Sequence, residues 1–553
     1  MNQKHFPFWP KRVPKELVYP QTPLFDFLEV SARRYPDQPG IIYYGREITY
    51  TEFWDSCQRL AGVLADMGVK KGDRVAVYMQ NCPHFSISYL GGMRANGVVV
   101  PLNPMLVDNE LRILLTDCEP KAVITTTELY PRLKGICDEL GINNIIVGAL
   151  SDYVPEDPDI PVPDFISQVP SSIEGTINWL DALKDAPAPP PVEVGPEDLC
   201  LLPYTAGSTG VPKGCMHTHK SVTSNVMGSI YWANGSPSMV ALAALPFFHV
   251  TGMIHSFLAP IANGGISVYL TRWDRTAALD AIEKYKINMW ANITTMLVDM
   301  LAAPDINERD ISSLSFVGGG GAPLPAALGE KFNKMTGLQF AEGYGMTETI
   351  SQTHWNPPDN PKLGSVGIPV FGVDSRIVDV ITLKELPIGE QGEIVVNGPQ
   401  VLKGYWNKPD ATAEAFTEID GKQFLRTGDI GRMDEDGYFY IMDRVKRMIN
   451  AAGFKVWPAD VESTLYRHPA VLEACVIGIP DDERVETVKA IIVLNKDSVG
   501  KVTEKDIIAW SKEQMSAYKY PRFVEFVESL PKSGAGKILW RQLQEEERER
   551  LKK

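Results

Sequence analysis

The sequence predicts an α/β fold with two domains: a large multi-sheet N-terminal domain with doubly wound βαβ parts, and a small α+β C-terminal domain. In the first half, near-continuous Val/Ile runs alternate with helical stretches, which is typical of a parallel sheet covered on both faces. After Asp443 the hydrophobic runs become shorter and look antiparallel. The chain has 553 residues, too many for one ordinary hydrophobic core.

The elements of the large domain are predicted from these runs in order. Strands are expected at residues 74–79, 97–102, 122–126, 144–147, 265–270 and 287–291. Helices are expected at residues 85–96, 109–117, 133–140 and 276–285. The most apolar window, residues 239–261, is interrupted by proline, glycine and histidine. Polar breaks are costly in lipid, so this window is predicted to be buried core and not a membrane span.

Two segments depart from this pattern. Residues 154–196 are rich in proline and acidic residues, and they are expected to form a surface excursion that is stiff and polyproline-like at its end. In the last part of the chain, residues 471–479 and 487–494 alternate as a strand pair, 504–514 are helical and 522–527 are extended. We therefore expect the large domain at residues 1–445 and the small domain at residues 446–553.

Composition excludes several classes of protein. The net charge of −15 disfavours a protein that binds duplex nucleic acid. The seven cysteines are odd in number and form no C-x-x-C pair, which disfavours a disulfide framework or a structural zinc site. The first 20 residues lack the apolar core of a signal peptide. These features predict a cytoplasmic protein with reduced thiols and no membrane span, and they are compatible with a homodimer.

The strongest local signal is a loop that suits phosphate. An apolar run leads into Thr205-Ala206-Gly207-Ser208-Thr209-Gly210-Val211-Pro212-Lys213-Gly214. Glycines let backbone N–H groups approach phosphates, hydroxyls donate further hydrogen bonds, and the lysine adds positive charge. The Gly-Lys-Ser/Thr ending of a Walker A loop is absent. An ordinary Gly/Ser/Thr turn is the alternative, but the length and composition of the loop favour phosphate binding.

The loop resembles the phosphate-binding signature of the adenylate-forming superfamily, which includes acyl-CoA synthetases, adenylation domains of peptide synthetases and beetle luciferases. The resemblance covers nearly the whole chain in the expected order: LPFFHVTG at 245–252, FVGGGGAPL at 316–324, EGYGMTET at 342–349, RTGD at 426–429, DRVK at 443–446 and PKSGAGK at 531–537. It implies the acyl-CoA synthetase branch, with a small, mobile C-terminal domain. The implied substrates are a carboxylic acid, ATP and coenzyme A, with Mg²⁺ as cofactor.

The resemblance also implies roles for individual residues. The residues expected to bind ATP or AMP are Thr205, Ala206, Gly207, Ser208, Thr209, Gly210, Lys213, Gly321, Ala322, Pro323, Glu342, Gly343, Tyr344, Gly345, Met346, Asp429, Ile441 and Arg444. Asp429 would accept hydrogen bonds from both ribose hydroxyls, which suits a carboxylate beside a cis diol. Ala206 and Glu342 depart from the commoner residues of the family, which are Ser or Thr and Gln.

Four residues are implied to take part in catalysis: Lys537, Thr347, Glu348 and His249. Lys537 would bridge the carboxylate and the α-phosphate, where a positioned cation is effective. Thr347 would bind phosphate, and Glu348 would hold Mg²⁺, which prefers oxygen ligands. His249 would gate the acyl pocket, although a histidine after two phenylalanines is also compatible with a core position. His217 and His219 have no residues spaced to complete a metal site, and we assign them no catalytic role.

The remaining roles concern the acid and the thiol. The acyl pocket is expected to contain His249, Gly319, Gly320 and Met346, and the coenzyme A tunnel Ala452, Gly453 and Phe454, with Lys446 as the hinge between the domains. The apolar pocket floor favours a medium-to-long-chain fatty acid. A short branched or aryl acid is the alternative, as is a stand-alone adenylation enzyme that loads a carrier protein. A luciferase-like oxygenase and a non-enzymatic nucleotide sensor are less compatible with the motifs.

Overall fold

The fold is a computed structural model that describes residues 4–166, 173–205, 212–320, 324, 326–451, 454–481, 485–532 and 538–552. The chain forms two compact units. Unit 1 is Met1–Ser375, Val396–Leu425 and Asp436–Phe439, and unit 2 is Arg376–Val395, Arg426–Glu435 and Tyr440–Lys553. The predicted domain boundary at residues 445/446 stays a prediction.

Unit 1 contains a doubly wound sheet. Among the described residues, seven strands lie in the order β11-β8-β4-β3-β5-β6-β7. Their bounds are β3 Arg74–Tyr78, β4 Val98–Leu102, β5 Ala122–Thr126, β6 Ile145–Gly148, β7 Ile177–Asn178, β8 Leu199–Leu201 and β11 His217–Thr218. The chain winds outward from β3 in both directions, since β4 lies on one side of it and β5 on the other, and these pairs are parallel. The predicted parallel sheet is confirmed.

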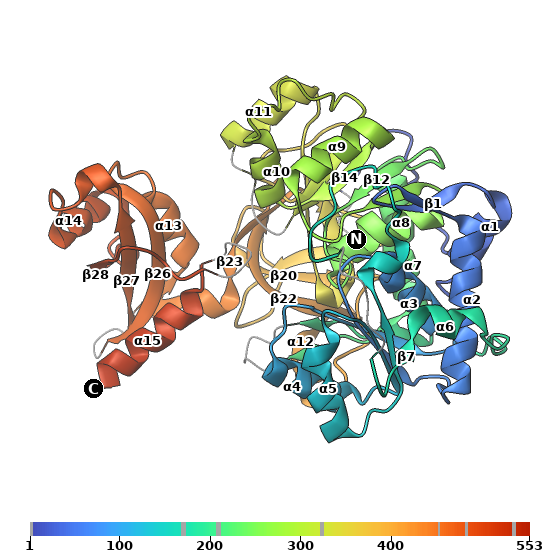
Figure 1. The fold of residues 1–553 in the computed structure, drawn as a ribbon. Coiled ribbons are helices and arrows are strands. Elements are labelled where there is room, and N and C mark those ends of the chain that lie inside the picture. The colour runs from blue at the N-terminus through green and yellow to red at the C-terminus, as the bar shows by residue number, and fades with distance from the viewer. Residues whose placement is uncertain are drawn as a thin grey trace. The chain divides into compact units, whose positions relative to one another are not determined.

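Helices connect these strands (Figure 1). They are α2 Tyr50–Asp66, α3 Pro83–Arg94, α4 Asp108–Cys118, α5 Tyr130–Leu140 and α6 Trp179–Lys184. Helix α2 packs against α3, and α4 packs against α5. The short apolar strands are buried along almost their whole length, which explains why they have continuous apolar sequences.

A second large sheet of unit 1 has nine strands within the described part of the chain, in the order β18-β17-β16-β15-β14-β12-β13-β1-β2. The bounds are β1 Pro39–Tyr43, β2 Arg46–Thr49, β12 Val240–Ala243, β13 Ile266–Tyr269, β14 Met289–Asn292, β15 Phe316–Gly320, β16 Ala341–Met346, β17 Ser351–Trp355 and β18 Ile368–Pro369. Neighbouring strands are parallel from β16 across the sheet to β1. Strand β2 at one edge, and β17 and β18 at the other, pair antiparallel.

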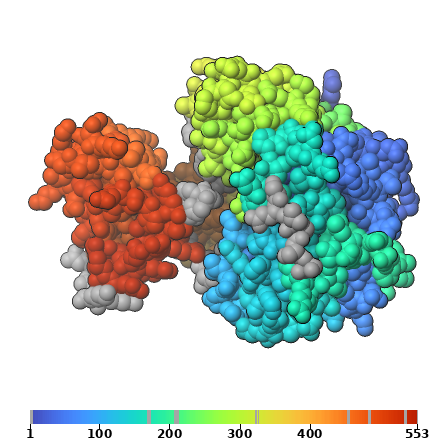
Figure 2. Space-filling model, viewed as in Figure 1, coloured from blue at the N-terminus to red at the C-terminus, as the bar shows by residue number. Residues whose placement is uncertain are grey.

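The helices that accompany this sheet are α1 Asp26–Arg34, α7 His219–Trp232, α8 Ala259–Ala262, α9 Arg275–Tyr285, α10 Thr294–Leu301, and α11 Ala326–Thr336. On the face shown in Figure 2, the yellow-green surface of unit 1 comes from the region of α9–α11, and the blue-cyan surface comes from the region of α4 and α5. One hydrophobic cluster extends through the strands of both large sheets. The two sheets of unit 1 therefore share a core.

Unit 2 contains the small sheet predicted for the end of the chain. Its strands are β24 Ile449–Ala451, β25 Phe454–Val456, β26 Val471–Asp481, β27 Val485–Leu494 and β28 Phe523–Phe526, and its helices are α13 Pro458–Leu465, α14 Glu504–Gln514 and α15 Trp540–Lys552. Strands β26 and β27 form the predicted antiparallel pair, whereas β28 pairs with β27 in parallel. This is the expected α+β pattern.

A further sheet, with β19 Asp374–Val378, β20 Gly392–Asn397, β21 Phe416–Ile419, β22 Lys422–Met433 and β23 Phe439–Arg444, contributes segments to both units. The short helix α12 Pro409–Ala415 precedes β21.

The proline-rich segment 154–196 is more regular than expected. It contributes the edge strand β7 and helix α6 to unit 1, because Asn178 caps the helix and the Trp179 ring is fully buried beside His84. The proline run is bound to the surface, since Arg94 and Asn96 donate hydrogen bonds to the carbonyls of Pro190 and Pro191. The expectation of a simple surface excursion was therefore incomplete.

All seven cysteines are buried free thiols, as the sequence predicted. Within the described residues, every helix is too short or too polar to cross a membrane. Residues 239–261 are instead core: β12, a π-helix at Gly252–Leu258 and α8.

Candidate functional site

The described residues on either side of the predicted phosphate loop pair with each other as two short strands. Strands β9 Tyr204–Thr205 and β10 Lys213–Gly214 pair antiparallel, with Thr205 opposite Lys213. The loop residues Ala206, Gly207, Ser208, Thr209 and Gly210 lie outside the described residues. At the hairpin base, the Tyr204 hydroxyl donates a 2.6 Å hydrogen bond to Asp117. The structure therefore brings the threonine and the lysine of this motif together at the two ends of the loop.

The Thr347–Glu348 motif follows strand β16 directly. It forms a short 3₁₀ helix, Thr347–Thr349. The Glu348 side chain is buried, with 7% of the residue exposed, and its Oε1 accepts a 2.9 Å hydrogen bond from the Tyr405 hydroxyl. Burial and the charge of Glu348 raise the pKa of Tyr405 far above its usual value, so this hydroxyl keeps its proton and remains a donor.

The histidines next to the phosphate hairpin have structural roles. His217 Nε2 donates a 2.8 Å hydrogen bond to the Thr347 carbonyl, and His219 Nδ1 accepts one of 3.0 Å from the Leu24 amide. Burial lowers the pKa of both to about 4, so both rings are neutral at physiological pH. No group of three or more metal-ligating side chains occurs in the described part of the chain.

Glycine residues line strands β15 and β16 where the acyl pocket and the nucleotide were predicted. At Gly319, an added Cβ would lie 1.8 Å from the Asn292 carbonyl oxygen. Glycine is thus required there, because no side chain fits between β14 and β15. Gly320 pairs with Gly343 across the parallel strands, while Gly321, Ala322 and Pro323 lie outside the described residues.

Glu342 is a buried carboxyl near the start of β16. It is in register with Gly319 on β15, and 7% of it is exposed. Burial raises the pKa of Glu342 to about 7, partly offset by a hydrogen bond from the Leu324 backbone. Two residues further on, the Tyr344 ring lies 5.7 Å from the buried His354 ring, and Met346 ends the strand.

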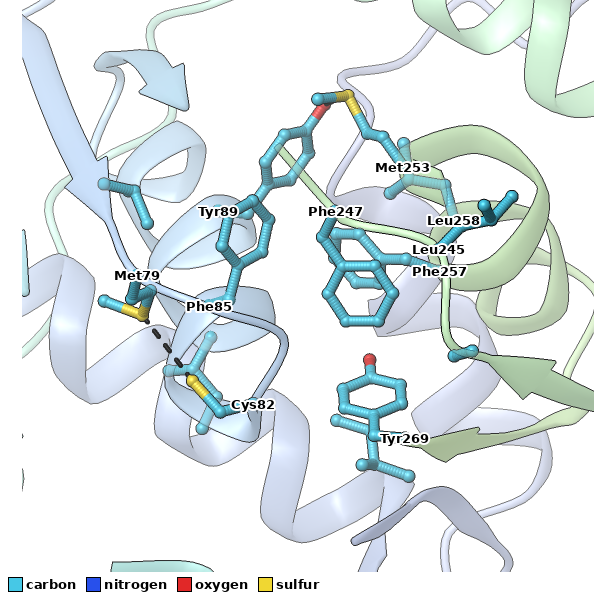
Figure 3. Close-up of a cluster of buried hydrophobic side chains, with 14 of the residues drawn as sticks. Met79, Cys82, Phe85, Tyr89, Leu245, Phe247, Met253, Phe257, Leu258 and Tyr269 are labelled. Carbon is cyan, nitrogen blue, oxygen red and sulfur yellow. Dashed lines mark hydrogen bonds between the residues drawn. The ribbon is translucent and has the colours of Figure 1, made fainter. Parts of the chain in front are cut away.

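His249 is exposed, which excludes the alternative that it is a core histidine. Its loop is fixed by the preceding Phe247, which is buried among Phe85, Phe257 and Tyr269 (Figure 3). At Gly252 a Cβ would lie 2.3 Å from the Pro246 carbonyl oxygen, so the loop closes tightly before the π-helix. π-Helical turns often occur at functional sites.

Unit 2 brings together the residues predicted to bind ribose. Arg444 Nε lies 2.6 Å from Asp429 Oδ1, and Asp429 is buried. Ile441 lies on the same strand as Arg444, β23, and is partly buried. The part of strand β22 before Asp429 is fixed by Glu393, which pairs with Arg426 at 2.8 Å and accepts a hydrogen bond from the Gly428 amide. An oriented carboxylate of this kind can accept hydrogen bonds from a diol.

The residues on either side of the two loops predicted in the C-terminal part also pair with each other. The base of the lysine loop is a bridge between Lys532 and Ile538, and Lys537 itself lies outside the described residues. The base of the tunnel loop is the pair Ala451–Phe454, and Ala452 and Gly453 lie outside the described residues. The backbone of Lys446 lies in a short 3₁₀ helix, Val445–Arg447.

Two functional-site residues were missed by sequence reasoning. Tyr405 contacts Glu348 and Lys213, and Glu393 holds the part of strand β22 before Asp429. The sequence signal for Tyr405 is weak: a glycine followed by two aromatic residues, Gly404-Tyr405-Trp406. In unit 1, Lys213 of the hairpin and the buried carboxylate of Glu348 are groups that suit phosphate and a hard cation. In unit 2, the carboxylate of Asp429 beside Arg444 suits ribose.

Comparisons with known proteins agree with this chemistry. The profile of the family described as AMP-binding enzyme matches residues 28–406, and that of the AMP-binding enzyme C-terminal domain matches residues 460–537. Over 553 residues the chain is 36% identical to the long-chain-fatty-acid–CoA ligase of Bacillus subtilis (strain 168), covering 98% of this chain and 97% of that protein. Over 514 residues it is 35% identical to a feruloyl-CoA synthase of an Amycolatopsis species, covering 92% of this chain and 96% of that protein.

Among solved structures, ATP-bound MatB from Rhodopseudomonas palustris is similar at a TM-score of 0.82 and 29% identity, covering 96% of this chain and 99% of that chain.

Proposed function

We propose that this chain, which belongs to the AMP-binding enzyme family and is an AMP-forming acid–CoA ligase, acts on a medium-to-long-chain fatty acid. This choice of acid is supported mainly by the similarity, over 98% of the chain, to a long-chain-fatty-acid–CoA ligase. The residues expected at the pocket floor, Gly319, Gly320 and Met346, agree with it because none of them carries a charge.

An aryl acid is the second candidate. It is favoured by the similarity over 92% of the chain to a feruloyl-CoA synthase. Initial rates of CoA-dependent AMP formation with octanoate, palmitate, ferulate and isobutyrate separate the candidates. We expect the highest kcat/KM with octanoate or palmitate, and a higher value with ferulate or isobutyrate would overturn the proposed substrate class. If no acid gives AMP with CoA but an acyl carrier protein does, the enzyme loads a carrier.

The reaction proceeds in two half-reactions at one site. A carboxylate oxygen of the acid attacks the α-phosphorus of ATP, and pyrophosphate leaves. The CoA thiolate then attacks the acyl carbon of the adenylate, and AMP leaves with the shared oxygen. Thr205 and Lys213, at the base of the phosphate hairpin, bind the phosphates with the loop residues 206–210. Lys537 neutralises the charge that develops between the carboxylate and the α-phosphate.

Glu348 would hold Mg²⁺, and the chain's residues fit that ion. The carboxylate supplies oxygen, the ligand atom that Mg²⁺ prefers, and Mg²⁺ is commonly held by one or two carboxylates together with substrate phosphates. The described residues form no complete metal cage of their own, which agrees with such shared coordination. When bound, Mg²⁺ would neutralise charge on the phosphates. Glu348 is held for this role by the Tyr405 hydroxyl.

The two half-reactions require a conformational step. The domain of residues 446–553 rotates about Lys446 relative to residues 1–445, which replaces Lys537 at the site with Ala452, Gly453 and Phe454 of the thiol tunnel. The short 3₁₀ helix at Val445–Arg447 supports a hinge at this point, since the chain changes there from strand β23 to the hairpin β24–β25.

We also propose that the enzyme works in the cytoplasm, which the seven buried free thiols support. A homodimer is a further expectation, and sedimentation analysis tests it.

A further inference from the structure

We infer that Tyr405 is a positioning residue that aims the Glu348 carboxylate at the metal and ties it to the phosphate-binding Lys213. This inference rests on the proposed function in one respect, which is that Glu348 is the metal-binding carboxylate. The role of Tyr405 itself follows from its contacts.

The first contact is the hydrogen bond to Glu348. The Tyr405 hydroxyl donates to Glu348 Oε1 at 2.9 Å, and both side chains are buried. In the described part of the chain, this is the only hydrogen bond that the carboxylate accepts. Hydrogen bonds to a charged group are stronger than neutral ones, and groups bonded to a metal ligand fix its orientation. Tyr405 therefore holds one carboxylate oxygen in place.

The second contact is with the phosphate hairpin. The Lys213 ammonium lies 4.8 Å from the centroid of the Tyr405 ring, on the ring face. Cations are attracted to the electron-rich face of an aromatic ring at such distances. Lys213 lies opposite Thr205 at the base of the predicted phosphate loop. One side chain thus contacts both the lysine and the carboxylate that are expected to meet the ATP phosphates.

The backbone around Tyr405 makes this arrangement rigid. The Leu402 amide donates to the Glu348 carbonyl at 2.9 Å. The Met216 amide donates to the Gly404 carbonyl at 3.0 Å, and the Trp406 amide donates to that of Gly214 at 2.8 Å. Residues 402–406 therefore bind the phosphate hairpin on one side and the Glu348 segment on the other. Tyr405, in the middle of this segment, has little freedom to move.

Two substitutions separate the two contacts. Tyr405→Phe keeps the ring beside Lys213 and removes only the hydroxyl, so Glu348 loses its orienting donor. Tyr405→Leu removes the ring as well. Loss of a residue that supports a metal ligand typically lowers metal affinity about 10- to 100-fold. We expect Tyr405→Phe to weaken the metal's contribution to nucleotide binding by this factor while metal-free ATP binds as before.

The experiment is calorimetric titration of the full-length protein with ATP in the absence of any carboxylic acid, once with Mg²⁺ and once with EDTA. The readout is the dissociation constant with EDTA divided by the dissociation constant with Mg²⁺, and measuring this ratio needs no catalysis. Tyr405→Phe should lower this ratio about 10- to 100-fold, and Tyr405→Leu should also weaken metal-free binding. The matched control is Tyr50→Phe, which also removes a buried hydroxyl, one that donates to the Gly265 carbonyl at 2.6 Å, and it should change neither constant.

Glu348→Gln distinguishes failure of the inference from failure of its premise. If Glu348→Gln lowers the ratio and Tyr405→Phe leaves it unchanged, Tyr405 does not position the carboxylate. An equal loss of affinity with Mg²⁺ and with EDTA in Tyr405→Phe also overturns the inference, because it indicates general packing. If Glu348→Gln itself leaves the ratio unchanged, the metal role of Glu348 fails and the inference falls with it.

Discussion

Arg444 and Asp429 form an ion pair across strands of unit 2, with 2.6 Å between Arg444 Nε and Asp429 Oδ1. The Asp429 side chain is 4% exposed, whereas the Arg444 side chain is 57% exposed. The buried member, Asp429, is the one expected to accept hydrogen bonds from both ribose hydroxyls. Its own amide donates to Thr427 Oγ1 at 3.1 Å, and that hydroxyl donates to the Ile394 carbonyl at 2.7 Å. Asp429 is therefore held at its amide by Thr427 and at its carboxylate by Arg444.

Asp429→Asn should weaken ATP binding and reduce discrimination between ATP and its 2′-deoxy analogue. An amide has one oxygen acceptor, so one of the two ribose hydroxyls loses its partner. A hydrogen bond to a charged group contributes about 1.5–3 kcal/mol, which corresponds to roughly a 10- to 100-fold loss of affinity measured by calorimetry. Asp497→Asn, at an exposed position of unit 2, is the control. Unchanged discrimination would show that Asp429 does not contact ribose.

Lys537→Ala should impair adenylation alone. Removing a key electrostatic group costs about 10²-fold or more in rate, and we expect this loss in acid-dependent ATP–pyrophosphate exchange. The same variant supplied with preformed acyl-adenylate and CoA should form thioester at a near-normal rate, because Lys537 is expected to be away from the site in that step. Lys501→Ala, an exposed lysine of the same unit, serves as the control. Equal losses in both half-reactions would contradict the assignment.

Gly453→Trp should give the opposite result. A side chain at this position is expected to narrow the path of the thiol, since glycine alone lacks a Cβ. The variant should exchange pyrophosphate normally and accumulate acyl-adenylate, yet release little acyl-CoA. Gly135→Trp, on the surface of α5 where a Cβ would meet no atom within 4 Å, controls for the bulky substitution. A thermal melt must show that the variant is folded; if folded Gly453→Trp forms acyl-CoA as fast as wild type, the tunnel assignment is wrong.

Glu342→Gln should change the pH dependence of stability. The folded-state pKa of Glu342 is raised from 4.5 to about 7, so the native state keeps a proton that the unfolded state releases. Stability is then lost as the pH rises from about 4.5 through about 7, and this loss amounts to about 3 kcal/mol at most. The melting temperature of Glu342→Gln relative to wild type should therefore rise between pH 5 and pH 8. Glu330→Gln, at an exposed position of α11, is the control, and a pH-independent difference for Glu342→Gln would refute the shift.

The sequence predicted the elements of the parallel sheets well because their signals are local. Buried strands such as β5 Ala122–Thr126 have continuous apolar sequences, and α14 Glu504–Gln514 begins after the capping Thr503. Both were predicted at the residues where they occur. The edge strand β7 was missed because its two exposed residues carry no such pattern.

Much of the site could not be predicted from local patterns. The contact of Tyr405 with Glu348 joins residues 57 positions apart, and it depends on how segment 402–406 pairs with the phosphate hairpin. Likewise, the raised pKa of Glu342 depends on the burial of its side chain in strand β16, which pairs with β15. The motifs nevertheless indicated which residues are expected to bind the nucleotide, because glycines beside hydroxyl, lysine and carboxylate residues in a fixed order are uncommon.

The most direct test of the acyl-adenylate route follows an oxygen atom. The acid is labelled with ¹⁸O in its carboxylate, and the products formed with ATP and CoA are examined by mass spectrometry. The account predicts one ¹⁸O atom in AMP, because the oxygen that attacks the α-phosphorus stays with AMP when the thiol attacks the acyl carbon. Unlabelled AMP, or ADP together with ¹⁸O in inorganic phosphate, would contradict it.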